Sequence, residues 1–163
     1  MVERKGRIGV TLKGYPHEVL AGQPIGAWSG EVYRRVVGAL REQLAVEGLT
    51  QPHWWTLNHV AGAPGAWNRT TLTARLARYE DLGIDFGGVF DDLAARGWLL
   101  EDGVGGGLSL TGEGEAARLR ARERNLRVHR RCHEGVEEAD FVTAVNVLRR
   151  ITANMGGDGG LPE

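Results

Sequence analysis

The sequence has a single cysteine and no long apolar segment. Cys132 cannot form a disulfide within the chain, and one free cysteine is typical of a protein from a reducing cytoplasm. No apolar run approaches the roughly 20 residues that a membrane span needs, and residues 1–20 are too polar and charged for a secretory signal. We therefore expect a cytoplasmic protein that makes no contact with a membrane.

The sequence also lacks an excess of positive charge. The 20 Lys and Arg residues stand against 21 Asp and Glu residues, which gives a formal net charge of −1. Such a chain has no overall basic field to attract nucleic acid, so any affinity for DNA must come from a local patch. With 163 residues, 42% of them hydrophobic, the chain is long enough to bury one substantial core.

The sequence also lacks the short motifs of common enzyme and metal sites. It has no G-x-S-x-G, no Walker glycine loop and no H-E-x-x-H, and the glycine loop at 103–107 is not followed by the helix and lysine of a phosphate site. His129 and His133 have a spacing that permits joint metal ligation, with Cys132 beside them. The arginines around them oppose a cation and no third ligand is evident, so we expect no metal and no cofactor.

The spacing of the apolar residues predicts six helices and one β-hairpin. Proline, threonine, asparagine or aspartate at the expected starts and glycine after the expected ends set the boundaries. Residues 1–23 are interpreted as an irregular arm with one possible strand at 7–14, and 156–163 as a flexible tail. The helices are expected at 24–47, 51–61, 69–82, 86–96, 111–134 and 137–155, and the strands at 98–102 and 108–110.

A pair of short helices followed by a hairpin is the order of a winged helix-turn-helix, so we expect one mainly α (α+β) domain over 24–155. The first helix and the last two cannot bury their apolar stripes on so small a module. A symmetric dimer in which these helices interdigitate would cover the stripes, and such pairs are the commonest oligomers. The stripes consist of Ile25, Trp28, Val32, Val36, Leu40 and Leu44 in the first helix and Phe141, Val145, Leu148, Ile151 and Met155 in the last.

Four segments in this order, LTQPHWWTLNHV, LAARGWL, LSLTGEGEAARLRA and FVTAVNVLRRITANM, resemble the MarR family of bacterial regulators. The opening Pro24-Ile25-Gly26-Ala27-Trp28 is similar to the P-x-G-x-W of a branch that is frequent in actinobacteria. The resemblance implies a homodimer with two winged lobes that represses transcription at a pseudo-palindrome. It also implies release of the DNA when a small, often phenolic, ligand enters a cleft. The reading helix would be 85–96 and the wing 101–110.

The lobe that would bind DNA is acidic. Four arginines between residues 62 and 111 stand against seven acids, and the wing loop 103–107 has no cation, whereas the wing of the family usually carries an arginine. Three interpretations stay open: a core helix with an acidic solvated side, a face released from DNA and reused, or a DNA reader. The reader would use Arg69, Thr70, Thr71, Arg75 and Arg78, together with Arg96, and its reading helix would present Gly87, Gly88, Asp91 and Asp92.

An arginine-rich helix is the rival patch for phosphates. Seven arginines lie between Arg118 and Arg131. We interpret them as an ion-paired, solvated face whose upper turns could still meet flanking phosphates.

The resemblance places the ligand cleft between the first two helices. Trp28 and Tyr33 come from the first, and Trp54, Trp55 and His59 from the second. Large indole rings and a titratable imidazole suit a planar aromatic or phenolic ligand; the alternative is a core helix rich in tryptophan.

The resemblance therefore implies a ligand-responsive transcriptional regulator that binds double-stranded DNA as a dimer. The alternative is a protein of the same fold that does not bind DNA. Such a protein would bind or catalytically transform an aromatic metabolite, with His17, His53 or His59 as the acid–base group.

Overall fold

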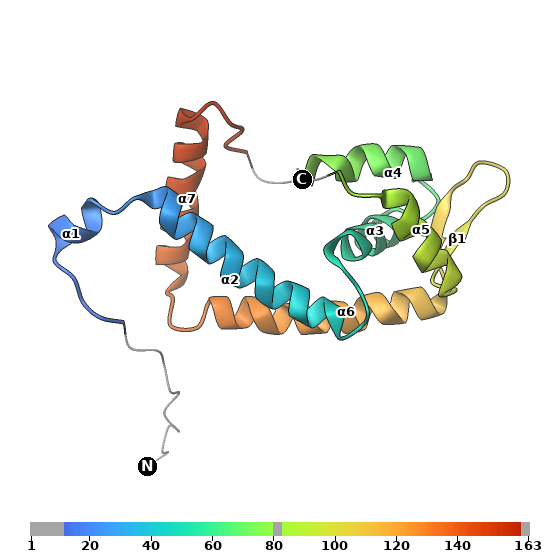
Figure 1. The fold of residues 1–163 in the computed structure, drawn as a ribbon, viewed down its shortest axis with the longest axis horizontal. Helices are drawn as coiled ribbons and strands as arrows, with labels where there is room; N and C mark the ends of the chain where they lie inside the picture. The colour runs from blue at the N-terminus through green and yellow to red at the C-terminus, as the bar shows by residue number, and fades with distance from the viewer. Residues whose placement is uncertain (1–11, 80–82, 161–163) are drawn as a thin grey trace, which may run out of the picture. The chain divides into compact units, whose positions relative to one another are not determined.

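The computed structural model describes residues 12–79 and 83–160, and Figure 1 shows its course. The chain divides into two units, residues 25–128 and residues 1–24 together with 129–163. No helix within the described ranges is both long and apolar enough to cross a membrane. The elements, in order, are α1 (His17–Ala21), α2 (Ile25–Ala45), α3 (Gln51–Gly62), α4 (Arg69–Leu76), the 3-10 helix η1 (Ala77–Tyr79), α5 (Phe86–Ala95), β1 (Leu99–Glu101), β2 (Leu108–Leu110), α6 (Gly112–Cys132) and α7 (Glu138–Asn154).

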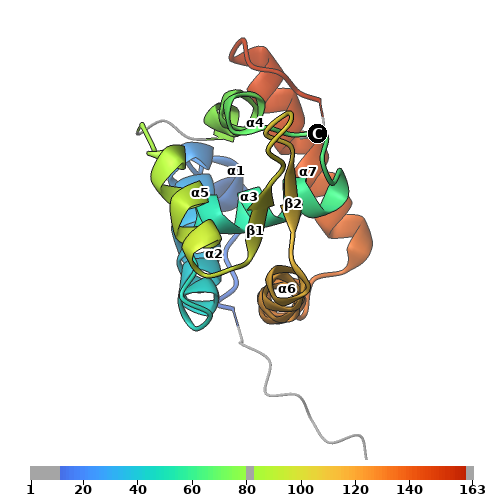
Figure 2. The same cartoon turned by 90° about the vertical axis from the view of Figure 1, so that its right-hand side faces the viewer.

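The unit 25–128 contains the expected winged helix-turn-helix. The helices α3, α4 and α5 are followed by the antiparallel pair β1 and β2, in which Leu99 lies opposite Leu110 and Glu101 opposite Leu108. Figure 2 shows the two strands side by side, with α3 behind them and α6 seen nearly end-on. The loop between the strands is closed by a backbone hydrogen bond from Asp102 N to Gly107 O of 2.9 Å.

The helix starts follow from cap chemistry that is visible in the sequence. The backbone N–H of Thr50 donates to Nδ1 of His53 at the start of α3. The side chain of Asn68 accepts from Thr71 N at 2.9 Å, while Thr71 Oγ1 accepts from Asn68 N at 3.1 Å. Each cap satisfies N–H groups that the first helical turn leaves without a partner.

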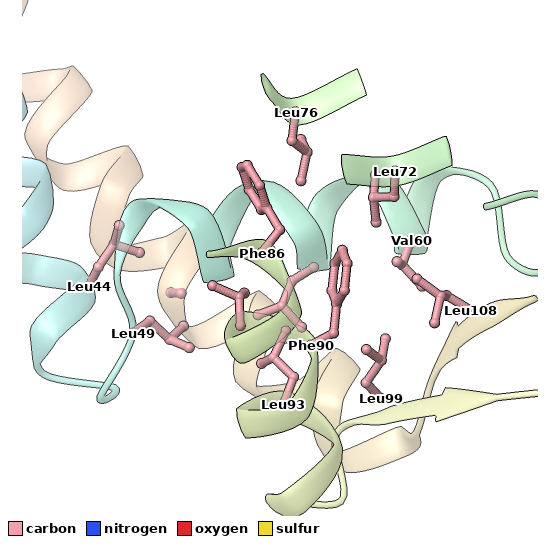
Figure 3. Packing of buried hydrophobic residues seen from close by; sticks show 13 residues of the cluster. Leu44, Leu49, Val60, Leu72, Leu76, Phe86, Phe90, Leu93, Leu99 and Leu108 are labelled. Atoms are coloured by element: carbon pink, nitrogen blue, oxygen red, sulfur yellow. The ribbon is translucent and has the colours of Figure 1, made fainter. Parts of the chain in front are cut away.

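The core lies where α3, α4, α5 and the hairpin meet. Figure 3 shows Phe90 of α5 pointing toward Val60 of α3 and Leu72 of α4, while Phe86 lies on the side of Leu76, and Leu108 of β2 lies at the end of the cluster next to Val60. Four apolar residues of α5 are buried in this core: Phe86, Val89, Phe90 and Leu93.

The start of α6 gives a physical reason for the L-T-x-x-G sequence at 110–114. Thr111 Oγ1 donates to Gly97 O at 2.7 Å and accepts from Gly114 N at 3.0 Å, so one hydroxyl ties the hairpin to the first turn of the helix. A Cβ atom on Gly114 would lie 2.2 Å from the carbonyl oxygen of Trp98. Only glycine allows the helix to approach the backbone of the hairpin so closely.

Two sequence predictions differ from the structure. The helix expected at 69–82 ends at Leu76 and continues as one 3-10 turn to Tyr79; residues 80–82 lie outside the described part. Leu76 is buried, whereas Ala77 and Arg78 directly after it are exposed, so these two residues have no core contacts that would extend the α-helix. The expected arm also contains the short helix α1, which starts directly after Pro16. The possible strand at 7–14 falls mainly outside the described residues.

The unit formed by 12–24 and 129–160 contains α1 and α7. The residues after α7 turn back along it, with Gly157 N donating to Thr152 O at 2.9 Å and Arg149 Nε donating to Gly159 O at 2.7 Å. The stripe predicted for this helix is exposed at Phe141, Leu148 and Met155.

Candidate functional site

The acidic residues of α5 all have partners inside the lobe. Asp85 caps the helix by accepting from Gly88 N at 3.1 Å. A Cβ atom on Gly88 would lie 2.8 Å from a carboxylate oxygen of Asp85, and one on Gly87 would lie 3.1 Å from the other. The two glycines therefore leave room for the capping carboxylate.

Asp91 is held by an arginine from another helix. Arg69 NH1 donates to Asp91 Oδ1 at 2.6 Å, and Arg69 Nε donates to Glu101 Oε2 at 2.9 Å. The guanidinium also lies 5.7 Å from the centre of the Phe90 ring. Hydrogen bonds with Asp91 and then Glu101 raise the pKa of Arg69. The guanidinium of Arg69 thus links α4 to α5 and β1. Its single positive charge faces two carboxylates, so the cluster keeps one net negative charge.

Asp92 faces the other side of α5 and contacts α3. Its Oδ2 accepts from Arg96 Nε at 2.7 Å and lies 3.0 Å from His53 Nε2. Because Nδ1 of His53 accepts from Thr50 N, the neutral ring carries its proton on Nε2 and donates it to Asp92. Burial lowers the pKa of His53, and the carboxylate of Asp92 opposes part of that shift. Burial also opposes ionisation of Asp92, but Arg96 and His53 together hold its pKa below the usual value.

The outward face of α5 consists almost entirely of glycine and alanine. Gly87, Gly88, Asp91, Ala94 and Ala95 are its exposed residues. Asp91 lies between the two pairs of small residues along the helix, and its side chain is 72% exposed. It is the one residue of this face that can form a side-chain hydrogen bond.

The remaining DNA-binding candidates lie on or next to α4. Thr70 is exposed at the second position of the helix, while the hydroxyl of Thr71 serves the cap with Asn68. Arg75 is half-buried and Arg78 is exposed on η1. Arg69 and Arg96 form salt bridges with two aspartates of α5, Asp91 and Asp92 respectively. The structure thus gives both arginines a structural role that the sequence did not predict.

Several of the arginines of α6 are ion-paired as expected. Glu47, whose side chain is 10% exposed, accepts from Arg120 Nε at 2.9 Å and from Arg124 Nε at 2.8 Å. These hydrogen bonds lower the pKa of Glu47, and the bond from Arg124 has the larger effect. Arg118 forms a bidentate pair with Glu115 and also donates to Asn58 Oδ1 of α3 at 3.1 Å.

The structure brings part of the proposed ligand site together on α3. Trp54 and Trp55 are half-buried and pack against the core. Nδ1 of His59 lies 2.9 Å from Trp55 O and donates to it, since a carbonyl can only accept. The imidazole also lies edge-on to the ring of Trp67, with centroids 6.0 Å apart. Trp67 was not among the predicted site residues, although its place in the tryptophan-rich segment 54–67 was a signal.

The other candidates for the ligand and acid–base site lie at other positions in the chain. Trp28 and Tyr33 lie in the first half of α2 with 55% and 62% exposure. His17 is exposed on α1 in the other unit. His53, the remaining acid–base candidate, caps α3 and contacts Asp92. Among the residues that the structure describes, no group of three His, Cys, Asp or Glu residues could hold a metal ion.

No protein family model and no curated protein matches this sequence. Solved structures do match. A MarR family transcriptional regulator from Silicibacter pomeroyi is 20% identical with a TM-score of 0.65, over 86% of this chain and 99% of that chain. CouR from Rhodococcus jostii bound to p-coumaroyl-CoA is 23% identical with a TM-score of 0.61, over 78% and 91%.

A MarR family protein of Mycobacterium tuberculosis in complex with DNA is also similar, at 17% identity and a TM-score of 0.61, over 79% of this chain and 98% of that chain. At these identities the likeness establishes the fold and leaves the activity to be inferred from the site. The chain has the mainly helical winged-helix fold of the MarR transcriptional regulators.

Proposed function

We propose that this protein is a dimeric, ligand-responsive transcriptional regulator that binds double-stranded DNA. The observation that carries the proposal is the extent of the likeness: it spans 86% of this chain and nearly the whole of a MarR regulator, winged lobe included. Within that family, the Pro24–Trp28 opening supports a place in the branch frequent in actinobacteria. A regulator of this kind would act on chromosomal DNA in the cytoplasm.

The electrostatics of the lobe support DNA binding better than its formal charge does. Asp85 is used as a cap, and Asp91 and Asp92 are paired with arginines. Their fields are therefore partly cancelled where α5 would enter the major groove. Arg75 and Arg78 on the preceding helices would contact phosphates, which supply most of the affinity of such complexes.

A small aromatic or phenolic ligand would bind near α3. CouR, whose structure is similar, binds p-coumaroyl-CoA, which contains a phenol. In this chain the ring of Trp67 lies edge-on to His59, and Trp55 lies one helical turn before His59 on α3, so aromatic surface and an imidazole occur close together there. The ligand would regulate DNA binding through its different affinities for the bound and free lobes.

The exposed apolar side chains support a homodimer. Ile25, Trp28 and Val32 are exposed on one stripe of α2, and Phe141 and Leu148 on one stripe of α7. Apolar stripes of this length on two helices favour burial against a second copy.

The test is fluorescence anisotropy of the full-length protein with a mixed-sequence duplex at several salt concentrations. We expect a non-specific Kd of roughly 10⁻⁴ to 10⁻⁶ M and a steep salt dependence. Arg75→Ala and Arg78→Ala should each weaken binding and reduce the salt slope by about one. Arg35→Ala on α2, an exposed arginine outside the lobe and outside the arginine-rich helix, is the control for loss of one positive charge. No binding at low salt would refute the proposal.

One observation favours a second function. The outward face of α5 offers no lysine or arginine for guanine, and the wing loop 103–107 offers no cation for the minor groove. A protein that binds or transforms an aromatic metabolite without DNA is therefore the second candidate. Hydroxycinnamic and benzoic acids should then quench tryptophan fluorescence in the absence of any duplex affinity, and Trp55→Ala should abolish the quench. A quench that persists in Trp55→Ala would place the site elsewhere.

A further inference from the structure

The outward face of α5 has one hydrogen-bonding side chain in its middle. Asp91 is flanked along the helix by Gly87 and Gly88 on one side and by Ala94 and Ala95 on the other, and all five residues are exposed. Small residues allow the helix to lie close to the floor of a groove, because no longer side chain keeps the backbone away. A short aspartate can then reach a base edge that it would otherwise miss.

Arg69 fixes the direction of this carboxylate. Its NH1 donates to Oδ1 at 2.6 Å, and its Nε is anchored on Glu101 of β1. The position of Asp91 is thus set from two other elements of the lobe. The nearby cation also reduces the repulsion between the carboxylate and the phosphates of a duplex, which an unpaired aspartate would feel in full.

The chemistry of the bases then selects among the partners. A carboxylate only accepts hydrogen bonds, so it needs an amino group in the major groove. Cytosine presents its N4 amino group, whereas adenine presents N6 beside the acceptor N7, which repels a carboxylate. Guanine and thymine present acceptors at their hydrogen-bonding positions.

We propose that Asp91, held by Arg69, is the specificity-determining residue of α5 and accepts a hydrogen bond from the amino group of a cytosine in the major groove. The inference rests on the proposed DNA-binding function and narrows it to a base preference. It makes Arg69 a positioning residue, which acts on the base pair through Asp91.

The test is selection of bound duplexes from a randomised pool by the full-length protein and its variants. The wild-type protein should select a cytosine that Asp91→Ala no longer selects, with the other preferred positions unchanged. Asp91→Asn should move that position toward adenine, because an amide pairs with N6 and N7 of adenine. In single duplexes, replacing the cytosine pair should weaken wild-type binding roughly tenfold and the binding of Asp91→Ala less than twofold.

Asp92→Asn is the matched control, since it removes an acid from the same helix on the side that faces His53. It should retain the cytosine preference. Circular dichroism of each variant confirms that the lobe is folded, so a changed preference cannot come from unfolding. Arg69→Leu should weaken the preference without moving it to another base.

An unchanged cytosine preference in Asp91→Ala would overturn the inference and leave the proposed function intact. Duplex binding by the wild-type protein without any base preference that depends on Asp91 would do the same. Absence of all duplex binding would overturn both.

Discussion

The substitution Gly114→Ala tests whether the close approach of α6 to the hairpin determines the stability of the lobe. The added Cβ would lie 2.2 Å from Trp98 O, 2.9 Å from Trp98 C and 3.0 Å from Trp98 Cα. All three are backbone atoms next to β1, so no side chain can rotate to relieve the contact. The hairpin or the first turn of α6 must move by nearly 1 Å before these distances become acceptable.

The expected cost follows from two opposing effects. Alanine is favoured over glycine in a helix by up to about 1 kcal/mol. Overpacking against a fixed backbone costs typically 1–3 kcal/mol, occasionally more, and the displacement also strains the hydrogen bond from Thr111 N to Trp98 O of 3.1 Å. We expect a net loss of roughly 1–3 kcal/mol in the free energy of unfolding, or a fall in Tm of about 2–4 °C for each kcal/mol.

The assay is urea unfolding followed by far-ultraviolet circular dichroism at one fixed protein concentration, because the proposed dimer would make apparent stability depend on concentration. Gly112→Ala is the matched control: it lies in the same first turn, and a Cβ there meets nothing within 4 Å. Gly112→Ala should equal or exceed the wild type in stability. If Gly114→Ala is as stable as Gly112→Ala, the explanation of the L-T-x-x-G sequence is wrong.

Three further predictions concern charge and assembly. Glu47→Gln should lower the free energy of unfolding by about 1–3 kcal/mol at pH 7. That deficit should shrink as the pH falls below the ordinary glutamate value near 4.5, because the pKa of Glu47 is lowered in the folded state; a constant deficit between pH 7 and pH 3 would contradict it. The His53 ring should titrate below its usual pKa of 6.5 in nuclear magnetic resonance, and Asp92→Asn should lower that pKa further, since the carboxylate raises it; a rise would refute the contact. Because His53 is neutral when buried, its contribution to stability is present above pH 6.5 and lost as the pH falls below it. Val32→Glu should convert the proposed dimer into a monomer in size-exclusion chromatography. Val46→Glu, at an exposed position outside the apolar stripe, should leave the dimer intact; a dimer in both variants would place the interface elsewhere.

The helices were predictable where one local interaction decides their start. Thr50, Asn68 and Asp85 each stand directly before the helix they were expected to cap, because a cap involves only residues three positions apart. The end of α4 was not predictable in this way. It depends on whether the next turn finds apolar partners, and the two residues directly after Leu76, Ala77 and Arg78, are exposed.

The short helix α1 was missed for a different reason. A proline often interrupts regular structure, but a proline directly before the first helical turn costs nothing, since the N–H it lacks would have had no partner in the helix. Pro16 therefore marks the start of α1, and Val19 N and Leu20 N donate to its carbonyl oxygen.

The candidate site was predicted only in its composition. A count of charges identifies an acidic lobe, but it cannot show that Arg69 reaches Asp91 over 22 residues and Glu101 over 32, or that His53 reaches Asp92 over 39. These separations follow from the packing of α3 and α4 against α5 and β1. No periodicity along the chain encodes them.

The pairing changes what the acids at the start of α5 and within it imply about function. Had Asp85, Asp91 and Asp92 all faced solvent unpaired, their charges would oppose the phosphates of any duplex that α5 approached. Two of them instead stabilise the lobe through a cap and a contact with α3, and only Asp91 remains both exposed and central on the face. The formal charge of the lobe is therefore a poor guide to DNA binding. A helix that presents an arginine prefers guanine, because arginine donates to the two guanine acceptors. A helix that presents one fixed carboxylate can only accept a hydrogen bond, and it should therefore prefer cytosine.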